Sequence, residues 1–351
     1  MKIEKSAIAS RLGKLKNVIS GRTVTDALQG VLFKDNCLTA NNLEIGVKAN
    51  LEIETDETFI IPLKAIELIE SLPDGIVEIT TDKSHAITIK TEGIKNKFQS
   101  FPPESFPAIQ SVINDISTVS ISSSDLQDAI NSVMYAVAAQ HNNQILTGLL
   151  FDSSDGVLNI VGCDGFRLAW SKLDYDKEFK FVVPKAAIQK LMSIGISGEI
   201  QVSYDSKTAI FKSKDYIVST RLLEGSYLNY KKMFPKYDNT TIIDRTAFIE
   251  SLRRSMICAD DRLKGAVKLQ LEESRMHITS NSSVSEYAEN IKLEAPIDAP
   301  IAIGFNAHYI VDCLRSFSCE KVEVSFGQAV QPMVVDDGRL SAIVLPVKLN
   351  A

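Results

Sequence analysis

The chain has 351 residues, of which 45% are apolar and 23% charged, a composition typical of a soluble globular protein of two to four domains. It has no run of about 18 apolar residues, and its charged N-terminus lacks the apolar core of a signal peptide, which excludes a transmembrane helix and favours the cytoplasm. The five cysteines form no C-x-x-C pair and the four histidines are dispersed, so there is no recognisable zinc motif and we expect no metal and no cofactor. The net charge of −6 disfavours a protein that coats nucleic acid nonspecifically.

The first third of the chain predicts two helices, each followed by strands. One apolar stripe recurs at spacings of three and four, at Ile8, Leu12, Leu15 and Ile19, which indicates one buried helix face. In chain order we expect a helix over 7–19, strands over 30–51, a helix over 62–72, strands over 75–91 and a connector over 102–109.

The same order of elements returns twice. Further helices are predicted over 125–138, 184–194, 247–258 and 306–317, with β-like runs between them. Pro62, Pro184 and Asn306 begin equivalent helices and stand 122 residues apart in each case. Proline suits a first helical turn and asparagine suits an N-cap, so the three starts are chemically related. This regular spacing indicates an internal repeat.

Glycines provide a second set of landmarks for the repeat. Gly30, Gly148 and Gly265 open equivalent strand runs at separations of 118 and 117 residues. Each repeat is predicted to contain, in order, a strand, a helix, several strands, a second helix and further strands. The length of a repeat that these separations give is a normal domain size. We therefore expect three α+β domains, at residues 1–117, 118–242 and 243–351.

Charge is distributed unevenly between the predicted helices and the remaining residues. The six helices together carry +3, which leaves −9 for the rest of the chain. Helices that face DNA would show this polarity, and so would the solvated helix faces of an ordinary protein.

Four local strings, in addition to the repeat, carry a family resemblance. They are FPPESFPAI (101–109), LTGLLFDSSDGVLNIVGCDGFRLAWSKL (146–173), GFNAHYIVDCLRS (304–316) and IVLPVKLNA (343–351). In this order and inside a threefold repeat, they resemble the bacterial DNA polymerase III beta subunit family, the DNA sliding clamps, over essentially the whole chain.

The resemblance implies a DNA-clamp fold of three tandem repeats of one topology, with helices lining a ring and sheets outside. The ring would be a head-to-tail homodimer that encircles double-stranded DNA without sequence preference and has no catalytic activity. Its partners would be the DNA polymerase III alpha subunit, clamp-loader subunits and other proteins with a clamp-binding motif.

The resemblance also implies three sets of site residues. A pocket for partner peptides, between the second and third repeats, would be formed by Leu146, Gly165, Arg167, Leu168, Met233, Asn306, Tyr309, Val330, Pro332, Ile343, Leu345, Pro346 and Val347. DNA contacts would come from Arg22, with Lys14 and Arg254 facing the same hole. The dimer interface would use Phe98, Ile257 and Cys258. Apolar and flexible side chains suit a pocket for peptide anchors, but the same residue types are also the usual material of a core.

Departures from the family pattern leave alternatives open. Phe166 stands where a histidine is frequent, Lys348 replaces a common arginine, and the loop 140–144 (QHNNQ) lacks the arginine and tyrosines of some members. A specialised clamp-like paralogue of phage or plasmid origin would fit these changes. An enzyme that uses Asp164 beside Cys163 is a further alternative, although Asp-Gly is first of all a turn and no base is placed by spacing.

Overall fold

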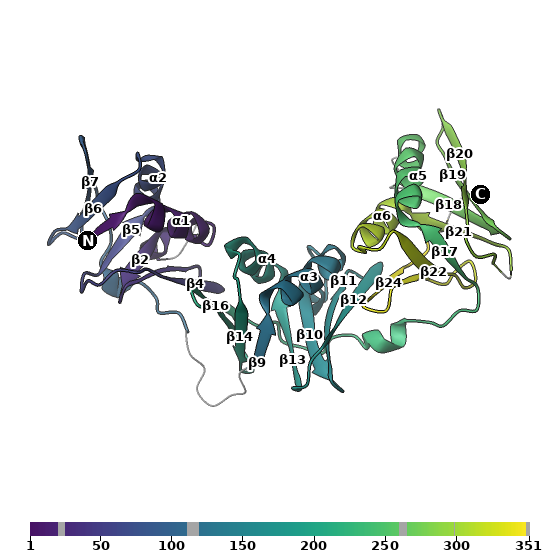
Figure 1. The fold of residues 1–351 in the computed structure, drawn as a ribbon, viewed down its shortest axis with the longest axis horizontal. Coiled ribbons are helices and arrows are strands. Elements are labelled where there is room, and N and C mark those ends of the chain that lie inside the picture. Colours follow the sequence, from purple (N-terminus) through teal and green to yellow (C-terminus); the bar gives the residue numbers. More distant parts are fainter. Residues whose placement is uncertain (20–24, 111–118, 260–264, 298, 349–351) are drawn as a thin grey trace. The chain divides into compact units, whose positions relative to one another are not determined.

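The computed structural model describes all residues except 20–24, 111–118, 260–264, 298 and 349–351. The chain forms two compact units. Figure 1 labels many of the helices and strands that make them up. Unit 1 consists of Met1–Leu126 and Ala186–Leu222, and unit 2 of Gln127–Lys185 and Leu223–Ala351. Across the described part of the chain, no helix is long and apolar enough to cross a membrane.

The threefold repeat is confirmed in the order of the elements. Each third of the chain has one strand, one helix, four strands, a second helix and three more strands. The helices are α1 (Lys5–Lys16), α2 (Leu63–Ser71), α3 (Ser123–Val133), α4 (Lys185–Ile194), α5 (Arg245–Cys258) and α6 (Ala307–Arg315).

Helices α1, α3 and α6 end at least two residues before their predicted ends, and α1 and α3 show the reason. After α1, the amides of Val18 and Ile19 donate to the carbonyls of Leu15 and Lys16, which are i to i+3 bonds. After α3, a 3₁₀ turn at Met134–Ala136 takes the place of the last predicted turn. The apolar side chains of a tightened last turn still reach the core, so the sequence stripe runs past the α-helix itself.

The strands form two kinds of four-stranded half-sheet. The A half-sheet of a repeat contains its second to fifth strands, and the B half-sheet contains its first and its last three strands. The A strands are β2 (Gly30–Lys34), β3 (Cys37–Asn41), β4 (Ile45–Asn50), β5 (Phe59–Pro62), β10 (Gly148–Ser154), β11 (Val157–Cys163), β12 (Arg167–Asp174), β13 (Phe179–Pro184), β18 (Ala266–Glu272), β19 (Arg275–Asn281), β20 (Glu286–Lys292) and β21 (Ile301–Asn306). The B strands are β1 (Lys2–Glu4), β6 (Ile76–Thr81), β7 (Ile87–Thr91), β8 (Ile94–Phe98), β9 (Val119–Ser122), β14 (Glu199–Tyr204), β15 (Thr208–Lys212), β16 (Tyr216–Arg221), β17 (Thr240–Asp244), β22 (Lys321–Ser325), β23 (Met333–Asp336) and β24 (Leu340–Val344).

Half-sheets of successive repeats join edge to edge. In unit 1, β4 of the first repeat pairs antiparallel with β16 of the second. In unit 2, β12 of the second repeat pairs antiparallel with β24 of the third. Each junction turns two half-sheets into an eight-stranded sheet, so each unit contains one end repeat and half of the middle one. One B half-sheet, with β8 at its edge, and one A half-sheet, with β20 at its edge, remain four-stranded.

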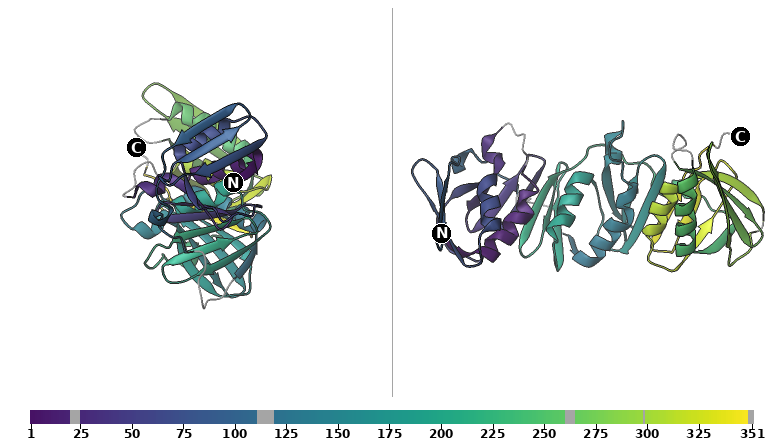
Figure 2. Two further views of the ribbon diagram at one scale, coloured as in Figure 1. Left: turned by 90° about the vertical axis from the view of Figure 1, so that its left-hand side faces the viewer. Right: turned by 90° about the horizontal axis from the view of Figure 1, so that it is seen from above.

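Two pairs of helices pack on the sheets of their own unit. In unit 1, α1 packs against α2 and covers β2 and β3, and in unit 2, α5 packs against α6 and covers β18, β19 and β20 (Figure 2). Ile8, Leu12 and Leu15 of α1 are fully buried. Burial of one such side chain contributes about 1.5–3 kcal/mol. The helical stripe in the sequence is therefore the main reason that α1 stays on its sheet.

Candidate functional site

The predicted peptide pocket lies in unit 2, along the junction of β12 and β24. Leu168 of β12 pairs with Ile343 of β24, and the chain continues from β24 into the segment 345–348. The amide of Leu345 donates to the carbonyl of Phe166 at 2.9 Å, and the amide of Val347 donates to the carbonyl of Gly304 at 2.8 Å. These two bonds hold the segment between the start of β12 and β21.

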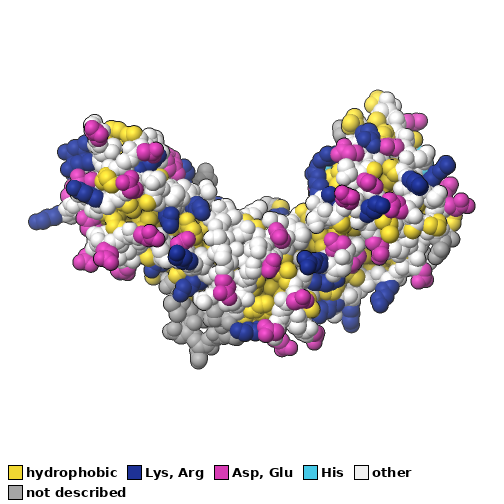
Figure 3. Space-filling view, in the orientation of Figure 1, with side chains coloured by type: hydrophobic (Ala, Val, Ile, Leu, Met, Phe, Trp, Pro, Cys, Tyr) yellow, Lys and Arg dark blue, Asp and Glu magenta, His cyan; other side chains and the backbone are white. Residues whose placement is uncertain are grey.

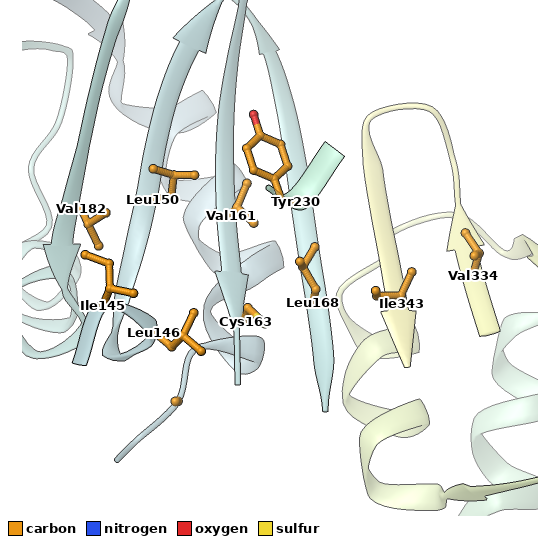
Figure 4. Close-up of a cluster of buried hydrophobic side chains, with 11 residues drawn as sticks. Ile145, Leu146, Leu150, Val161, Cys163, Leu168, Val182, Tyr230, Val334 and Ile343 are labelled. Carbon is orange, nitrogen blue, oxygen red and sulfur yellow. The ribbon is translucent and has the colours of Figure 1, made fainter. Parts of the chain in front are cut away.

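Three predicted pocket residues form the floor of this junction rather than its surface. Leu146, Leu168 and Ile343 are buried members of one hydrophobic cluster that spans neighbouring strands (Figure 4). Their exposed fractions are 7%, 1% and 4%. An aromatic layer from the connector after β16, including Tyr230 and Phe234, packs on the same cluster.

The surface of the site is formed by exposed apolar side chains. Met233, Val330 and Leu345 are 47%, 77% and 37% exposed, and Phe166 is 58% exposed. Single exposed apolar side chains are normal on a monomer surface, but they mark interaction sites when they gather. The segment that carries Leu345 is bonded to Phe166, so at least these two belong to one surface.

Arg167 is held by acidic and aromatic neighbours. Its Nε lies 3.0 Å from Asp164 Oδ2 and its Nη1 lies 2.7 Å from Asp312 Oδ2. Its guanidinium lies 5.2 Å from the ring centre of Tyr135 and 4.5 Å from that of Tyr309. Burial lowers the pKa of Arg167, but its contacts with the two carboxylates outweigh this effect and raise it. Arg167 therefore positions Tyr309 and α6 and has little charge left for a partner.

Asn306 and Tyr309 have different parts in the site. The Asn306 side chain accepts from the amide of His308 at 2.9 Å and caps α6, which is a structural role. The ring of Tyr309 stacks on that of Phe166 with 6.0 Å between centres. The sequence marked Phe166 only as a departure from the family pattern, and its exposed ring against Tyr309 now makes it a functional candidate.

The sequence CDGFR is a turn in the structure. Gly165 has a φ of +87°, and the Asp164 carboxylate accepts from the amides of Phe166 and Arg167 at 2.9 and 3.0 Å. Burial raises the pKa of the Cys163 thiol, which disfavours the reactive thiolate. The arrangement is that of a turn held by its own hydrogen bonds, and it gives no support to an active site here.

A cavity of about 440 Å³ adjoins the C-terminal segment. Its walls include three of the predicted pocket residues, Val330, Pro346 and Val347, together with Lys268 and Lys348. Pro332 is half-buried and does not line it. The sequence did not point to Lys268, because its approach to the C-terminal segment depends on strand pairing between β18 and β21.

The residues predicted to contact DNA lie on helices of both units or outside the described part. Lys14 of α1 lies over the ring of Tyr216 at 5.0 Å. Arg254 of α5 makes contacts of 2.7 to 3.1 Å with the Glu289 carboxylate, so its charge is paired. Arg22 falls outside the described residues.

The predicted interface residues lie on or beside the unpaired sheet edges. Phe98 is the last residue of β8 and is partly exposed. Ile257, near the end of α5, is 83% exposed, and Cys258 accepts a hydrogen bond from the Ser285 hydroxyl at 3.1 Å. Ser285 directly precedes β20, so Cys258 lies beside that edge.

The fold and an apolar, non-catalytic site define a protein that holds other macromolecules. Profiles of the DNA polymerase III beta subunit match along the chain: the N-terminal domain at residues 1–110, the central domain at 120–229 and the C-terminal domain at 231–347. The chain therefore belongs to the DNA polymerase III beta subunit family, which comprises the sliding clamps, non-catalytic processivity factors of DNA replication.

Individual relatives agree over the full length. The beta sliding clamp of Vibrio cholerae is 24% identical over 366 residues, covering 99% of both chains, and that of Halalkalibacterium halodurans is 24% identical over 95% of this chain and 94% of its own. The solved DNA polymerase sliding clamp of Bacillus subtilis has a TM-score of 0.93 at 21% identity, and the Thermotoga maritima beta subunit a TM-score of 0.90 at 24%, each covering 99% of both chains. The predicted clamp fold is confirmed.

Proposed function

We propose that two copies of this chain close head to tail into a ring around duplex DNA by pairing β20 of one copy with β8 of the other. The observation that carries the proposal is the repeated half-sheet junction. An A half-sheet joins the B half-sheet of the following repeat at β4–β16 and again at β12–β24. The third A half-sheet and the first B half-sheet have no such neighbour within the described chain. Pairing them between copies repeats the same junction and covers two open edges.

The internal repeat also predicts the register of that pairing. On the A side, equivalent positions of the three repeats are found from the pairing of each edge strand with the strand before it. These positions are Gly46, Leu168 and Glu286, which pair with Asn41, Cys163 and Asn281. On the B side, the equivalent positions found in the same way are Ser219, Ile343 and Lys97, which pair with Ile210, Val334 and Thr88 of the preceding strands. Gly46 pairs with Ser219 and Leu168 with Ile343. Glu286 of one copy should therefore pair with Lys97 of the other, which places opposite charges face to face.

The apolar residues fit the same register. One step along the strands, Ser285 falls opposite Phe98 of the other copy. The Ser285 hydroxyl is bonded to the carbonyl of Cys258, and Ile257 beside it is exposed. Phe98 of one copy would then pack near Ile257 and Cys258 of the other, which is the set of interface residues that the family resemblance implies.

Cysteine pairs test the register directly. With the half-buried Cys258 and Cys319 replaced by alanine, a Lys97→Cys, Glu286→Cys chain should form a covalent dimer under mild oxidation, because directly opposed residues have Cβ atoms about 4.5–5.5 Å apart. The matched control Asn96→Cys, Glu286→Cys should not, since Asn96 points to the other sheet face. Crosslinking of the control pair instead would overturn the register, and a monomer in analytical ultracentrifugation would overturn the ring.

DNA would be held by topology and by long-range charge. Lysines on the helices would attract phosphates without reading bases, which permits sliding. On the face that Figure 3 shows, Lys and Arg side chains alternate with Asp and Glu and form no uniform basic surface. Retention on nicked circular DNA that is lost on linearisation tests this part, and equal retention on both forms would contradict it.

The site at the β12–β24 junction would dock short motifs of the DNA polymerase III alpha subunit, of clamp-loader subunits and of other clamp-binding proteins in the cytoplasm. Exposed Met233, Phe166 and Leu345 offer apolar contacts to a pair of Leu or Phe anchors. Affinity for one peptide should be modest, because few side chains are buried and the peptide must be ordered on binding. Fluorescence anisotropy with a labelled Gln-Leu-x-Leu-Phe peptide measures it.

A further inference from the structure

The cavity beside the C-terminal segment is lined by apolar residues and by two lysines, Lys268 and Lys348. Ile303, Val330, Pro346 and Val347 supply apolar surface, and the small residues Ala302 and Gly304 add little bulk. Its volume of about 440 Å³ is larger than a single inorganic ion needs and lies in the range of sites for small organic ligands. It opens next to residues of the proposed peptide site, so a bound peptide could extend into it.

The two ammonium groups come from distant parts of the chain. Lys268 lies on β18, and Lys348 follows β24 by four residues. Both side chains are exposed, and among the described residues neither forms an ion pair within 4.0 Å. Arg167 differs from them, because Asp164 and Asp312 already neutralise its guanidinium. Among the charged residues that line the cavity itself, these two lysines are the ones open to a partner.

We propose that this cavity binds carboxylate groups of a partner peptide, on residues that flank its apolar anchor pair. The proposal rests on the proposed function, since it needs the anchor to dock at the β12–β24 junction. Two like charges with no acidic neighbour in contact favour an anionic ligand. The apolar residues of the same lining favour a peptide, whose methylene groups can contact Val330 and Pro346, over a free phosphate or a nucleic acid backbone.

Peptide flanks and charge reversal together test the proposal. Labelled, C-terminally amidated Gln-Leu-Ser-Leu-Phe peptides would carry two aspartates, two asparagines or two lysines, placed on either the N-terminal or the C-terminal flank. At low salt, the aspartate peptide with the correct flank should bind about threefold to tenfold more tightly than the asparagine peptide, and the preference should shrink as salt is added. In Lys268→Glu, Lys348→Glu protein, the lysine peptide should become the better ligand.

Two controls make each outcome decisive. Lys212→Glu on β15 changes an exposed lysine of unit 1, whereas the cavity belongs to unit 2, and it should keep the aspartate preference. The asparagine peptide should bind the parent and the double variant equally, which shows that the anchor site is intact. If no peptide binds the parent, the proposed function fails; if all bind equally whatever their flanks, the proposed function stands and the carboxylate site is overturned.

Discussion

Replacement of Asp312 by asparagine tests whether Arg167 couples α6 to β12. An exposed ion pair contributes about 0–1 kcal/mol, and loss of one member of a fully buried pair costs about 3–5 kcal/mol. The Arg167 side chain is 12% exposed and that of Asp312 is 37% exposed. Asp164 remains to balance part of the charge, and solvent screens Asp312. We therefore expect Asp312→Asn to lower the free energy of unfolding of unit 2 by about 1–2 kcal/mol.

Fluorescence of the single tryptophan can measure this loss of unfolding free energy. Trp170 lies on β12, three residues after Arg167, and packs against Tyr230 and Phe234, so its fluorescence reports the state of this sheet in urea. The matched control is Glu250→Gln on α5, which removes an ion pair to Arg253 whose two side chains are each 45% exposed. The control should shift unfolding by no more than about 0.5 kcal/mol.

Peptide binding provides the second measurement on the same variant. Arg167 lies against the ring of Tyr309, and Tyr309 stacks on exposed Phe166, so release of the guanidinium should loosen that aromatic pair and weaken peptide affinity. Equal urea midpoints for Asp312→Asn and the control, with unchanged peptide affinity, would refute the idea that Arg167 acts as a positioning residue.

Three further variants test separate parts of the proposals. Met233→Asp should weaken binding of the Gln-Leu-x-Leu-Phe peptide about tenfold or more in anisotropy, because it puts a charge at an apolar contact, while Ile76→Asp, an exposed apolar site of unit 1, should not. Lys14→Gln should shorten retention on nicked circular DNA more than Arg254→Gln does, since Glu289 already neutralises Arg254; the reverse order would contradict the assignment. The hydrogen bonds from Arg254 hold the pKa of Glu289 below its usual range. The Glu289 carboxylate therefore stabilises the folded protein above its unfolded pKa of about 4.3, and this contribution is lost as pH falls through its folded pKa. Glu289→Gln should flatten the fall in denaturation temperature below about pH 4, and an unchanged pH profile would count against the assignment.

The repeat and the helices were predictable because their signals are local. The spacing of Ile8, Leu12 and Leu15 records one helix face, and the proline or asparagine at each helix start records one turn. The pairing of β12 with β24 left no comparable signal. An antiparallel register between strands about 170 residues apart depends on the whole sheet, so alternation alone gives the buried face but not the neighbour.

The same limit explains what the sequence could and could not say about the site. Family matching located the junction, yet it could not separate buried Leu168 from exposed Val330, since both are ordinary core residue types. Nor could it foresee that Arg167 would meet Asp312, which lies 145 residues away in sequence. Charges at a site depend on such distant partners, and this is why Arg167, paired with Asp164 and Asp312, offers less charge to a partner than Lys268 and Lys348 do.

Ion pairing also reduces the positive charge that the helices can offer to DNA. The sequence count gives the helices a surplus of positive charge, but Lys16 is paired with Glu70 at 2.7 Å, and Arg253 and Arg254 are paired with Glu250 and Glu289. Each pairing reduces the number of cations able to displace counterions from DNA, and with it the salt dependence of binding. A ring that holds DNA by enclosure gains from this, because each strong phosphate contact would have to break at every step along the duplex. We infer that the paired cations on α1 and α5 make weak contacts with phosphates, the condition under which an enclosed duplex can slide.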